Sequence, residues 1–251
     1  MKNYTAQQGA TITLNNHGET TTLDIYSKEG LDMLSNLWIK SAAEHRLMYE
    51  PTWLGRPLIQ FPTDIVAMQE LIWSLRPDVI IETGVAHGGS LVLSASILEL
   101  IGNGKVIGVD IEIRAHNRLA IESHPLKHRI ELIEGSSIAE ETISAVKMAI
   151  GGGQKVMVVL DSNHSEAHVL KELELYSSFV TPGSYMVAHD GSQAWVWDIP
   201  RGRLEWKHSH PLGAIHKFLS RHSEFSIESH WTRWGITSSP EGFLMRTISK
   251  S

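Results

Sequence analysis

Short apolar runs and amphipathic segments alternate along most of this chain. The runs with the β-branched and apolar composition of strands are residues 79–82, 105–110, 129–134, 155–160 and 185–188. The segments between them that carry apolar residues at helical spacing are residues 91–100, 117–122, 138–150 and 166–177. Because strands that are apolar along their whole length are buried on both faces, this alternation predicts a parallel sheet covered by helices on both sides.

The C-terminal part of the chain departs from this pattern. A helix is expected over residues 211–220, followed by strand-like segments at residues 225–230 and 242–248. The connection at residues 235–241 is short, which allows the last two strands to pair antiparallel. We therefore expect an α/β fold of the Rossmann-like, doubly wound type, whose mostly parallel seven-stranded sheet ends in an antiparallel pair of strands.

The N-terminal part has a different character from the rest. The elements expected there are a hairpin of residues 11–14 and 20–25 around the turn Asn15-Asn16-His17-Gly18, a helix over residues 29–47, and an irregular aromatic loop over residues 49–57. We interpret residues 1–60 as an N-terminal arm and residues 61–251 as the catalytic domain. Asp64 is expected to cap the first helix of that domain.

The composition narrows the range of partners and locations. The chain has 22 basic and 28 acidic residues, a net charge of −6, which argues against nucleic acid or an anionic membrane as a partner. It has no cysteine, which excludes disulfides, thiolate metal sites and a cysteine nucleophile. The first residues lack the apolar core of a signal peptide, and no apolar stretch approaches the ~18 residues of a membrane span. We expect a cytoplasmic protein.

Polar side chains follow each strand of the predicted parallel sheet. In an open α/β sheet, ligands bind outside the carboxyl ends of the strands. The residues expected at those ends are Glu82, Asp110, Glu134-Gly135-Ser136-Ser137, Asp161-Ser162-Asn163-His164 and His189-Asp190. Chance would scatter such residues over both edges of the sheet, so their convergence on one edge is more specific than any single motif.

The first strand leads through the turn Thr83-Gly84-Val85-Ala86-His87-Gly88-Gly89-Ser90 into a helix. Such a turn presents backbone N–H groups and a helix N-terminus to a ligand, although glycines at this spacing are also compatible with a simple loop. The spacing differs from the G-x-G-x-x-G of dinucleotide-binding proteins, and the G-K-[ST] triplet of a P-loop is absent from the sequence. Asp110, after the second strand, is suited to the hydroxyls of a ribose or, alternatively, to capping a helix.

The order of these motifs resembles a known family. E-T-G-x-x-x-G-G-S, V-D-I-E, E-G-S-S, L-D-S-N-H and H-D resemble class I S-adenosylmethionine-dependent methyltransferases, and more closely the cephalosporin hydroxylase/rhamnosyl O-methyltransferase family. The resemblance runs from about Trp53 to the end of the chain. It implies an S-adenosylmethionine-dependent O-methyltransferase that acts on a hydroxyl of a sugar or of a glycosylated metabolite, a small-molecule acceptor.

The resemblance also implies where the cofactor binds. The residues expected around its methionine part are Glu82, Thr83, Gly84 and Ser90, with His87 and Gly88 in the same turn and Asp161 opposite. Asp110 would bind the ribose, and Ser136 or Ser137 would lie near the adenine.

Members of the family bind Mg²⁺ through an Asp after the fourth strand and an acidic pair after the fifth. Asp161 and Asp190 match this pattern, while His189 stands where the family usually has Glu. Because Mg²⁺ prefers oxygen ligands, His189 either shifts the preference toward a transition metal or turns away and leaves the ion to Asp161, Asp190 and water. His164 matches the family's proposed general base beside Asp161, or else is a surface histidine at the start of a helix.

Two other functions compete with methyl transfer. A hydroxylase of the non-haem iron type needs two histidines and a carboxylate, which His164-Ser165-Glu166 and His222-Ser223-Glu224 offer only superficially in an α/β fold. A non-catalytic cofactor-binding subunit would explain the loss of Glu at position 189. The loop 193–202 is expected to form a lid over the pocket, in which Trp195 and Trp197 either stack on a sugar or aromatic acceptor or pack against a neighbouring subunit. The apolar arm suggests a homo-oligomer.

Overall fold

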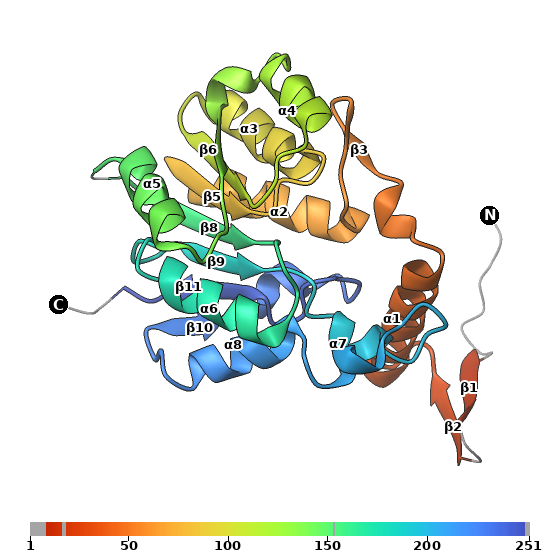
Figure 1. Cartoon of the computed structure of the whole chain (residues 1–251). Coiled ribbons are helices and arrows are strands. Elements are labelled where there is room, and N and C mark those ends of the chain that lie inside the picture. The colour runs from red at the N-terminus through yellow and green to blue at the C-terminus, as the bar shows by residue number, and fades with distance from the viewer. Residues whose placement is uncertain (1–8, 17–18, 153, 249–251) are drawn as a thin grey trace.

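The architecture is a seven-stranded sheet between two layers of helices, as seen in a computed structural model that describes residues 9–16, 19–152 and 154–248 (Figure 1). The parallel strands are β5 (Val79–Thr83), β6 (Lys105–Asp110), β7 (Ile130–Glu134), β8 (Val156–Leu160) and β9 (Tyr185–Ala188). The antiparallel strands at one edge are β10 (Phe225–Ile227) and β11 (Phe243–Arg246). Their spatial order is β10-β11-β9-β8-β5-β6-β7, which confirms the expected fold class.

Alternate residues of the central strands feed two separate hydrophobic cores, as strand geometry requires. Ile80 of β5 packs with α2 (Pro62–Leu75), α3 (Gly89–Ile101) and α4 (Ala115–Glu122) on one face. Its neighbours Val79 and Ile81 pack with α5 (Glu140–Ile150), α6 (Glu166–Tyr176) and α8 (Pro211–Leu219) on the other. Every residue of β5 and β8 is buried, so these two strands form the centre of the sheet.

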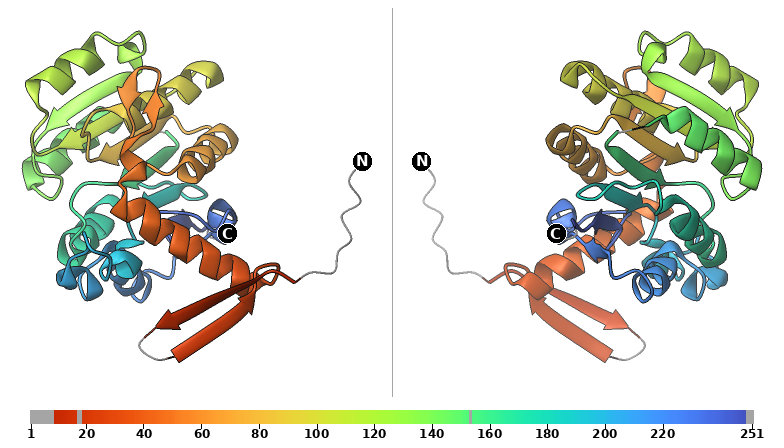
Figure 2. Two further views of the ribbon diagram at one scale, coloured as in Figure 1. Left: turned by 90° about the vertical axis from the view of Figure 1, so that its right-hand side faces the viewer. Right: turned by 90° about the vertical axis from the view of Figure 1, so that its left-hand side faces the viewer.

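The N-terminal arm contains the expected hairpin and helix. Strands β1 (Thr11–Asn16) and β2 (Glu19–Asp24) pair antiparallel. His17 and Gly18 of the expected turn, and Gly153 further along the chain, lie outside the described residues. The helix α1 (Lys28–Glu44) begins at Ser27, whose side chain accepts a hydrogen bond from the Gly30 N–H. Figure 2 shows the hairpin projecting from the body of the molecule.

Two local expectations are corrected by the structure. Asp64 does not cap α2, because the N-cap is Phe61 and Pro62 occupies the first helical turn; the Asp64 carboxylate turns inward and accepts hydrogen bonds from Thr237 and Ser238. The aromatic loop is more ordered than expected. It contains a 3₁₀ turn η1 (Leu47–Tyr49) and a short hairpin of β3 (Thr52–Trp53) and β4 (Arg56–Pro57).

The region after β9 packs on the arm. It contains α7 (Gln193–Val196) and the 3₁₀ turn η3 (Leu204–Lys207). Val196 shares a small apolar cluster with Phe61 and with Ile39 and Ala42 of α1. Lys40 of α1 also forms an ion pair with Asp198 at 2.7 Å. The arm and this loop therefore support each other beside the sheet. Every helix within the described ranges is too short or too polar to cross a lipid bilayer.

Removal of a core side chain tests the assigned layers. Leu71 of α2 is fully buried, so Leu71→Ala should lower the free energy of unfolding by about 2–5 kcal/mol because it leaves a cavity. Leu100→Ala on α3 is the matched control, since Leu100 is 78% exposed and should change stability by less than about 0.5 kcal/mol. Urea unfolding followed by circular dichroism measures both, and equal effects would contradict the assigned core.

Candidate active site

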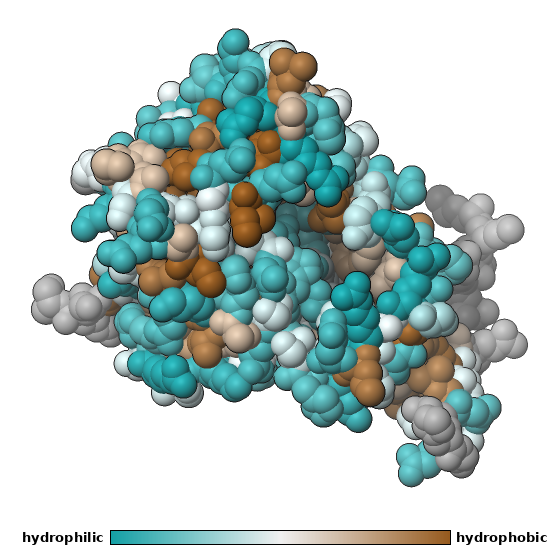
Figure 3. Space-filling model, in the orientation of Figure 1, coloured by the Kyte–Doolittle hydropathy of each residue, from teal (hydrophilic) through white to brown (hydrophobic). Residues whose placement is uncertain are grey.

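The candidate site lies where the sheet reverses its order. Neighbouring strands β5 and β8 run parallel, but the chain leaves β5 toward one layer of helices and β8 toward the other, which opens a crevice at their carboxyl ends. A cavity of about 610 Å³ occupies this position. Its lining comes from the glycine turn, the ends of β8 and β9, the arm and residues 192–206. We call it the main cavity; a recess in this region is visible in Figure 3.

The glycine turn is held against the end of β8. Gly84 has φ +93°, and a Cβ there would lie 2.0 Å from the backbone oxygen of Asp161. Gly88 has φ +81° and precedes α3 as its N-cap. Only glycine combines this backbone conformation with such close approach. The two glycines therefore bring the N-terminus of α3 and the Asp161 loop together around the main cavity.

Asp110 organises the glycine turn from the neighbouring strand. Its Oδ2 accepts hydrogen bonds from the backbone N–H groups of Val85 and Ala86, at 2.8 and 3.3 Å. Asp110 is not among the residues that line the main cavity, whereas Val85, Ala86 and His87 are. Its role at a ribose stays a prediction, and its visible role is to fix the turn.

Glu82 is a buried carboxyl beneath the turn. It is 1% exposed, and its Oε1 accepts a hydrogen bond from the Ser90 hydroxyl on α3. Burial raises the pKa of Glu82 to about 7, with the Ser90 hydrogen bond opposing that rise. The neighbouring Thr83 is fully buried, so of these residues Gly84 and Ser90 are the ones that line the main cavity.

Ser137, one of the two serines after β7, lies in a buried polar cluster. Ser137 Oγ lies 3.1 Å from His168 Nε2, and the Tyr176 hydroxyl donates to the Ser137 carbonyl at 3.0 Å. Ser162, next to Asp161, donates to Glu172 in the same cluster at 2.7 Å. Neither Ser136 nor Ser137 is among the cavity-lining residues, so their place near an adenine stays a prediction.

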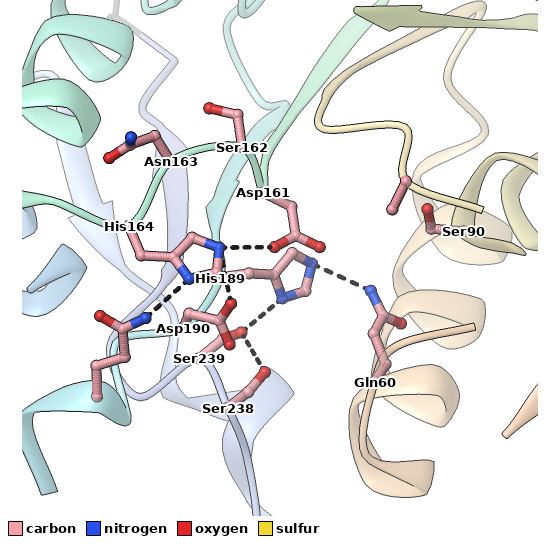
Figure 4. Close-up of polar contacts among 12 residues, drawn as sticks. Gln60, Ser90, Asp161, Ser162, Asn163, His164, His189, Asp190, Ser238 and Ser239 are labelled. Atoms are coloured by element: carbon pink, nitrogen blue, oxygen red, sulfur yellow. Dashed lines mark hydrogen bonds and ion pairs between the residues drawn. The ribbon is translucent and has the colours of Figure 1, made fainter. Parts of the chain in front are cut away.

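Asp161, His164 and Asp190 converge at one end of the main cavity (Figure 4). His164 Nε2 lies 3.1 Å from Asp190 Oδ2 and 3.8 Å from Asp161 Oδ1. Asp190 reaches this position with φ +60°. Residues other than glycine seldom adopt this left-handed conformation, and those that do are often found at functional sites. On the far side of the ring, Gln193 Nε2 lies 2.8 Å from His164 Nδ1.

The donor set of this cluster fits a divalent cation. One ligating atom from each of the three residues lies within 4.8 Å of the others, a spacing that a single ion can bridge. Burial, followed by the nearby Asp190 carboxylate, raises the pKa of Asp161 well above its ordinary value. Two neighbouring, half-buried carboxylates that repel each other are a setting in which a bound cation can replace protons.

His189 faces away from this cluster. Its ring is 3% exposed, with Nδ1 2.7 Å from Ser239 Oγ and Nε2 3.5 Å from Gln60 Nε2 (Figure 4). The Ser239 hydroxyl is in turn hydrogen-bonded to the Ser238 hydroxyl, which donates to the buried carboxylate of Asp64. The structure therefore brings Asp161, Asp190 and His164 together, and it does not bring His189 into that group.

The other site expectations resolve differently. Trp195 packs in the apolar cluster with α1 and Trp197 lies under Lys207, so neither lines the main cavity, while Trp206 does. Among the described residues, neither H-x-E pair contributes both its histidine and its glutamate to a group of three ligating side chains; His164 belongs to such a group without Glu166. Glu166 pairs with Lys217, and His222 lies between Glu174 and Glu224.

Sequence reasoning missed Gln60, Gln193 and Ser239. Each contacts a candidate histidine, yet no motif surrounds them, and Gln60 lies about 130 residues before its partner His189. The only signal in the sequence is that Gln193 belongs to the loop after β9, the position from which acceptor contacts were expected.

The sheet order, with the glycine turn at its switch point, places the chain in the class of Rossmann-like, doubly wound α/β proteins. The fold matches that of the CmcI-N160 apo-structure with a TM-score of 0.57 and 18% identity, over 80% of this chain and 78% of that one. The CmcI-D160 structure with Mg and SAM gives a TM-score of 0.56 at 18% identity, over the same shares of the two chains.

The family is shown by sequence. The model of the Rhamnosyl O-methyltransferase/CmcI family matches residues 45–247, and the chain belongs to this family. A rhamnosyl O-methyltransferase from Mycobacterium leprae is 32% identical over 202 residues, which cover 78% of this chain and 82% of the relative. One from Mycobacterium bovis is 28% identical over 207 residues, covering 78% of each chain.

The buried carboxyl of Glu82 predicts a pH-dependent stability. The folded protein keeps a proton between about pH 4.5 and pH 7 that the unfolded chain has lost, so the free energy of unfolding should fall as pH rises through this window. A shift of this size corresponds to about 3 kcal/mol. Glu82→Gln removes the effect.

Urea unfolding of the wild type and of Glu82→Gln across this pH range measures the difference between the two proteins. Other buried carboxyls cancel in the comparison because both proteins contain them. A difference that stays constant with pH would contradict the assigned burial of an ionisable Glu82.

Proposed function

We propose that this protein is an S-adenosylmethionine-dependent, metal-assisted O-methyltransferase that acts on a hydroxyl of a sugar or of a glycosylated metabolite. Family membership supports the reaction class. The observation that carries the proposal is the convergence of Asp161, His164 and Asp190 beside a glycine turn in one cavity. The glycine turn presents helix N–H groups that can bind a ligand. The neighbouring carboxylate–imidazole cluster can take part in proton transfer.

We assign the cofactor to the glycine-turn side of the main cavity. Gly84, His87 and Ser90 line this side, with Gly88 shaping the turn. Glu82 and Thr83 support it from below, and Asp110 from the next strand. When bound there, S-adenosylmethionine supplies an electrophilic methyl group. This assignment is supported by CmcI-D160, a structural neighbour that binds Mg and SAM.

We assign the divalent cation to Asp161 and Asp190, with Mg²⁺ as the ion. Two carboxylates and water supply the oxygen ligands that Mg²⁺ prefers. We leave His189 out of the ligand set because both of its ring nitrogens face other polar side chains in a buried site. When bound, the cation lowers the pKa of an acceptor hydroxyl that contacts it.

His164 is the proposed general base. A base needs an unprotonated Nε2, so the proton of the neutral ring must sit on Nδ1, the atom that faces Gln193. Gln193 Oε1 is buried without a hydrogen-bond partner among the described residues. A half-turn of the Gln193 amide lets Oε1 accept from Nδ1–H and satisfies that oxygen. Nε2, which lies 3.1 Å from Asp190 Oδ2, is then the atom that would take the hydroxyl proton when Asp190 is engaged as a metal ligand.

The arm closes the acceptor side of the main cavity. Ile39, Ala43, Met48 and Tyr49 line it together with residues of the catalytic domain. We therefore keep residues 1–60 as an arm that completes the acceptor site, and residues 61–251 as the domain that binds the cofactor. Cytoplasmic location belongs to the same proposal.

A homo-oligomer is also part of this proposal. Leu31, Leu34 and Trp38 of α1 are 38–54% exposed, and Tyr26 before it is 76% exposed. The neighbouring hairpin projects from the body, and an isolated hairpin of two strands is at best marginally stable in water. Both features support a subunit contact through the arm.

Removal of the base should separate catalysis from binding. His164→Ala should lower kcat by about 10²–10⁴-fold, because the hydroxyl proton then has no acceptor, while the affinity for S-adenosylhomocysteine stays close to that of the wild type. Methyl transfer to an accepted sugar and calorimetric titration of S-adenosylhomocysteine measure the two properties.

The exposed His208→Ala is the control for that substitution, since His208 is not among the cavity-lining residues. Unchanged turnover in His164→Ala would remove His164 as the base. Absence of saturable S-adenosylhomocysteine binding in the wild type would overturn the proposed function itself.

The ligand assignment predicts different metal affinities for two variants. Asp161→Asn should weaken Mg²⁺ binding by at least about tenfold, because a charged ligand is lost. His189→Asn should leave Mg²⁺ affinity nearly unchanged, because His189 is not in the proposed ligand set. The asparagine side chain preserves a polar partner for Ser239, so the surrounding structure should be kept. Calorimetric titration of Mg²⁺ in the presence of S-adenosylhomocysteine measures both. Equal weakening in the two variants would place His189 in the ligand set.

A further inference from the structure

The acceptor side of the main cavity carries positive charge on an acidic protein. Three arginines line the cavity, namely Arg46, Arg201 and Arg203. The carboxylates that line it are Asp161 and Asp190, which we have assigned to a cation. The chain as a whole has a net charge of −6. This local reversal of sign favours a negatively charged ligand in the cavity.

Two of these arginines lie over aromatic rings that line the same cavity. The Arg46 guanidinium is 4.6 Å from the centre of the Tyr49 ring, and that of Arg203 is 5.7 Å from the Trp206 ring. An aromatic face holds a guanidinium while leaving the N–H groups in its plane available. One pair comes from the arm and the other from the loop before α8.

Neither guanidinium is strongly engaged by a carboxylate. Within the described ranges, Arg46 takes part in no ion pair, and Arg203 lies 3.4 Å from Glu205 with both side chains more than 60% exposed. Exposed pairs of this kind are weak and exchange readily with a ligand. Arg201 is tied to Glu44 by a 3.6 Å ion pair and by its backbone N–H, which makes it the less available of the three.

The position of each arginine is set by the chain around it. Arg46 has φ +59° and ψ +33°, where the chain turns from α1 into η1. Arg203 borders a second hollow together with His164, Gln193 and Trp206. Arg203 therefore lies on the wall that also carries the proposed base, within the part of the cavity where an acceptor would be held.

We propose that the acceptor carries an anionic group, a carboxylate or a phosphate, that Arg46 and Arg203 bind while its hydroxyl faces His164. This inference rests on the proposed function, because it names the acceptor class of the same site. The planar fork of a guanidinium matches the geometry of both anions by paired N–H···O bonds. A sugar acid and a sugar phosphate share this chemistry.

Sugars matched in shape and different in charge test the proposal. Glucose, glucuronate and glucose 1-phosphate are titrated calorimetrically into the protein saturated with S-adenosylhomocysteine. At low ionic strength at least one anion should bind about tenfold or more tighter than glucose, and the stronger of the two anions identifies the group. Rising salt should weaken the anion and leave glucose unchanged.

The double variant Arg46→Gln/Arg203→Gln should weaken the anions by at least about tenfold and leave both glucose and S-adenosylhomocysteine binding unchanged. The matched control is Arg221→Gln, an exposed arginine that pairs loosely with Glu174 at 3.6 Å and does not line the cavity. Anions that bind no tighter than glucose, or a double variant that binds them normally, would overturn the proposal. If the wild type shows no saturable binding of S-adenosylhomocysteine, the proposed function itself is overturned.

Discussion

The structure depends on the parallel pairing of β5 and β8 and on the close approach of the loops that follow them. The Asp161 N–H donates to the Thr83 carbonyl, and Gly84 lies against the Asp161 carbonyl at a distance that excludes any side chain. This contact fixes the glycine turn relative to Asp161, the proposed metal ligand. Because both loops continue directly from buried strands, the packed core of the sheet determines the geometry of the site.

Much of the fold and half of the site could be predicted from the sequence. The strands are short apolar runs with polar residues at their ends, and parallel pairing brings such ends to one edge. That reasoning places Gly84, Asp161, His164 and Asp190 together without any distance information. It succeeds because each residue is next to its strand, so its position follows from local chain direction.

The rest of the site depends on contacts between distant segments. Gln60 and Ser239 meet His189 from before β5 and after β10, and Asp64 turns inward to Thr237 rather than capping its helix. These contacts form when α2 and the loop before β11 pack together. Nothing in the sequence around these residues indicates that the two segments meet. A buried polar side chain such as His189 points toward the groups that can hydrogen-bond to it, and those groups come from distant parts of the chain.

The presence of an imidazole, rather than a carboxylate, at position 189 has an electrostatic consequence. Burial and the neighbouring Asp190 already raise the pKa of Asp161, so a third carboxylate beside them would add repulsion in the ligand-free protein. Burial instead lowers the pKa of His189, so its ring is neutral and adds no charge to the cluster. The buried Asp64 carboxyl lies behind His189 at the end of a hydrogen-bonded chain through Ser239 and Ser238, and burial raises its pKa. The chain thus keeps the polar framework of the site and leaves the pair of carboxylates, Asp161 and Asp190, for the proposed cation.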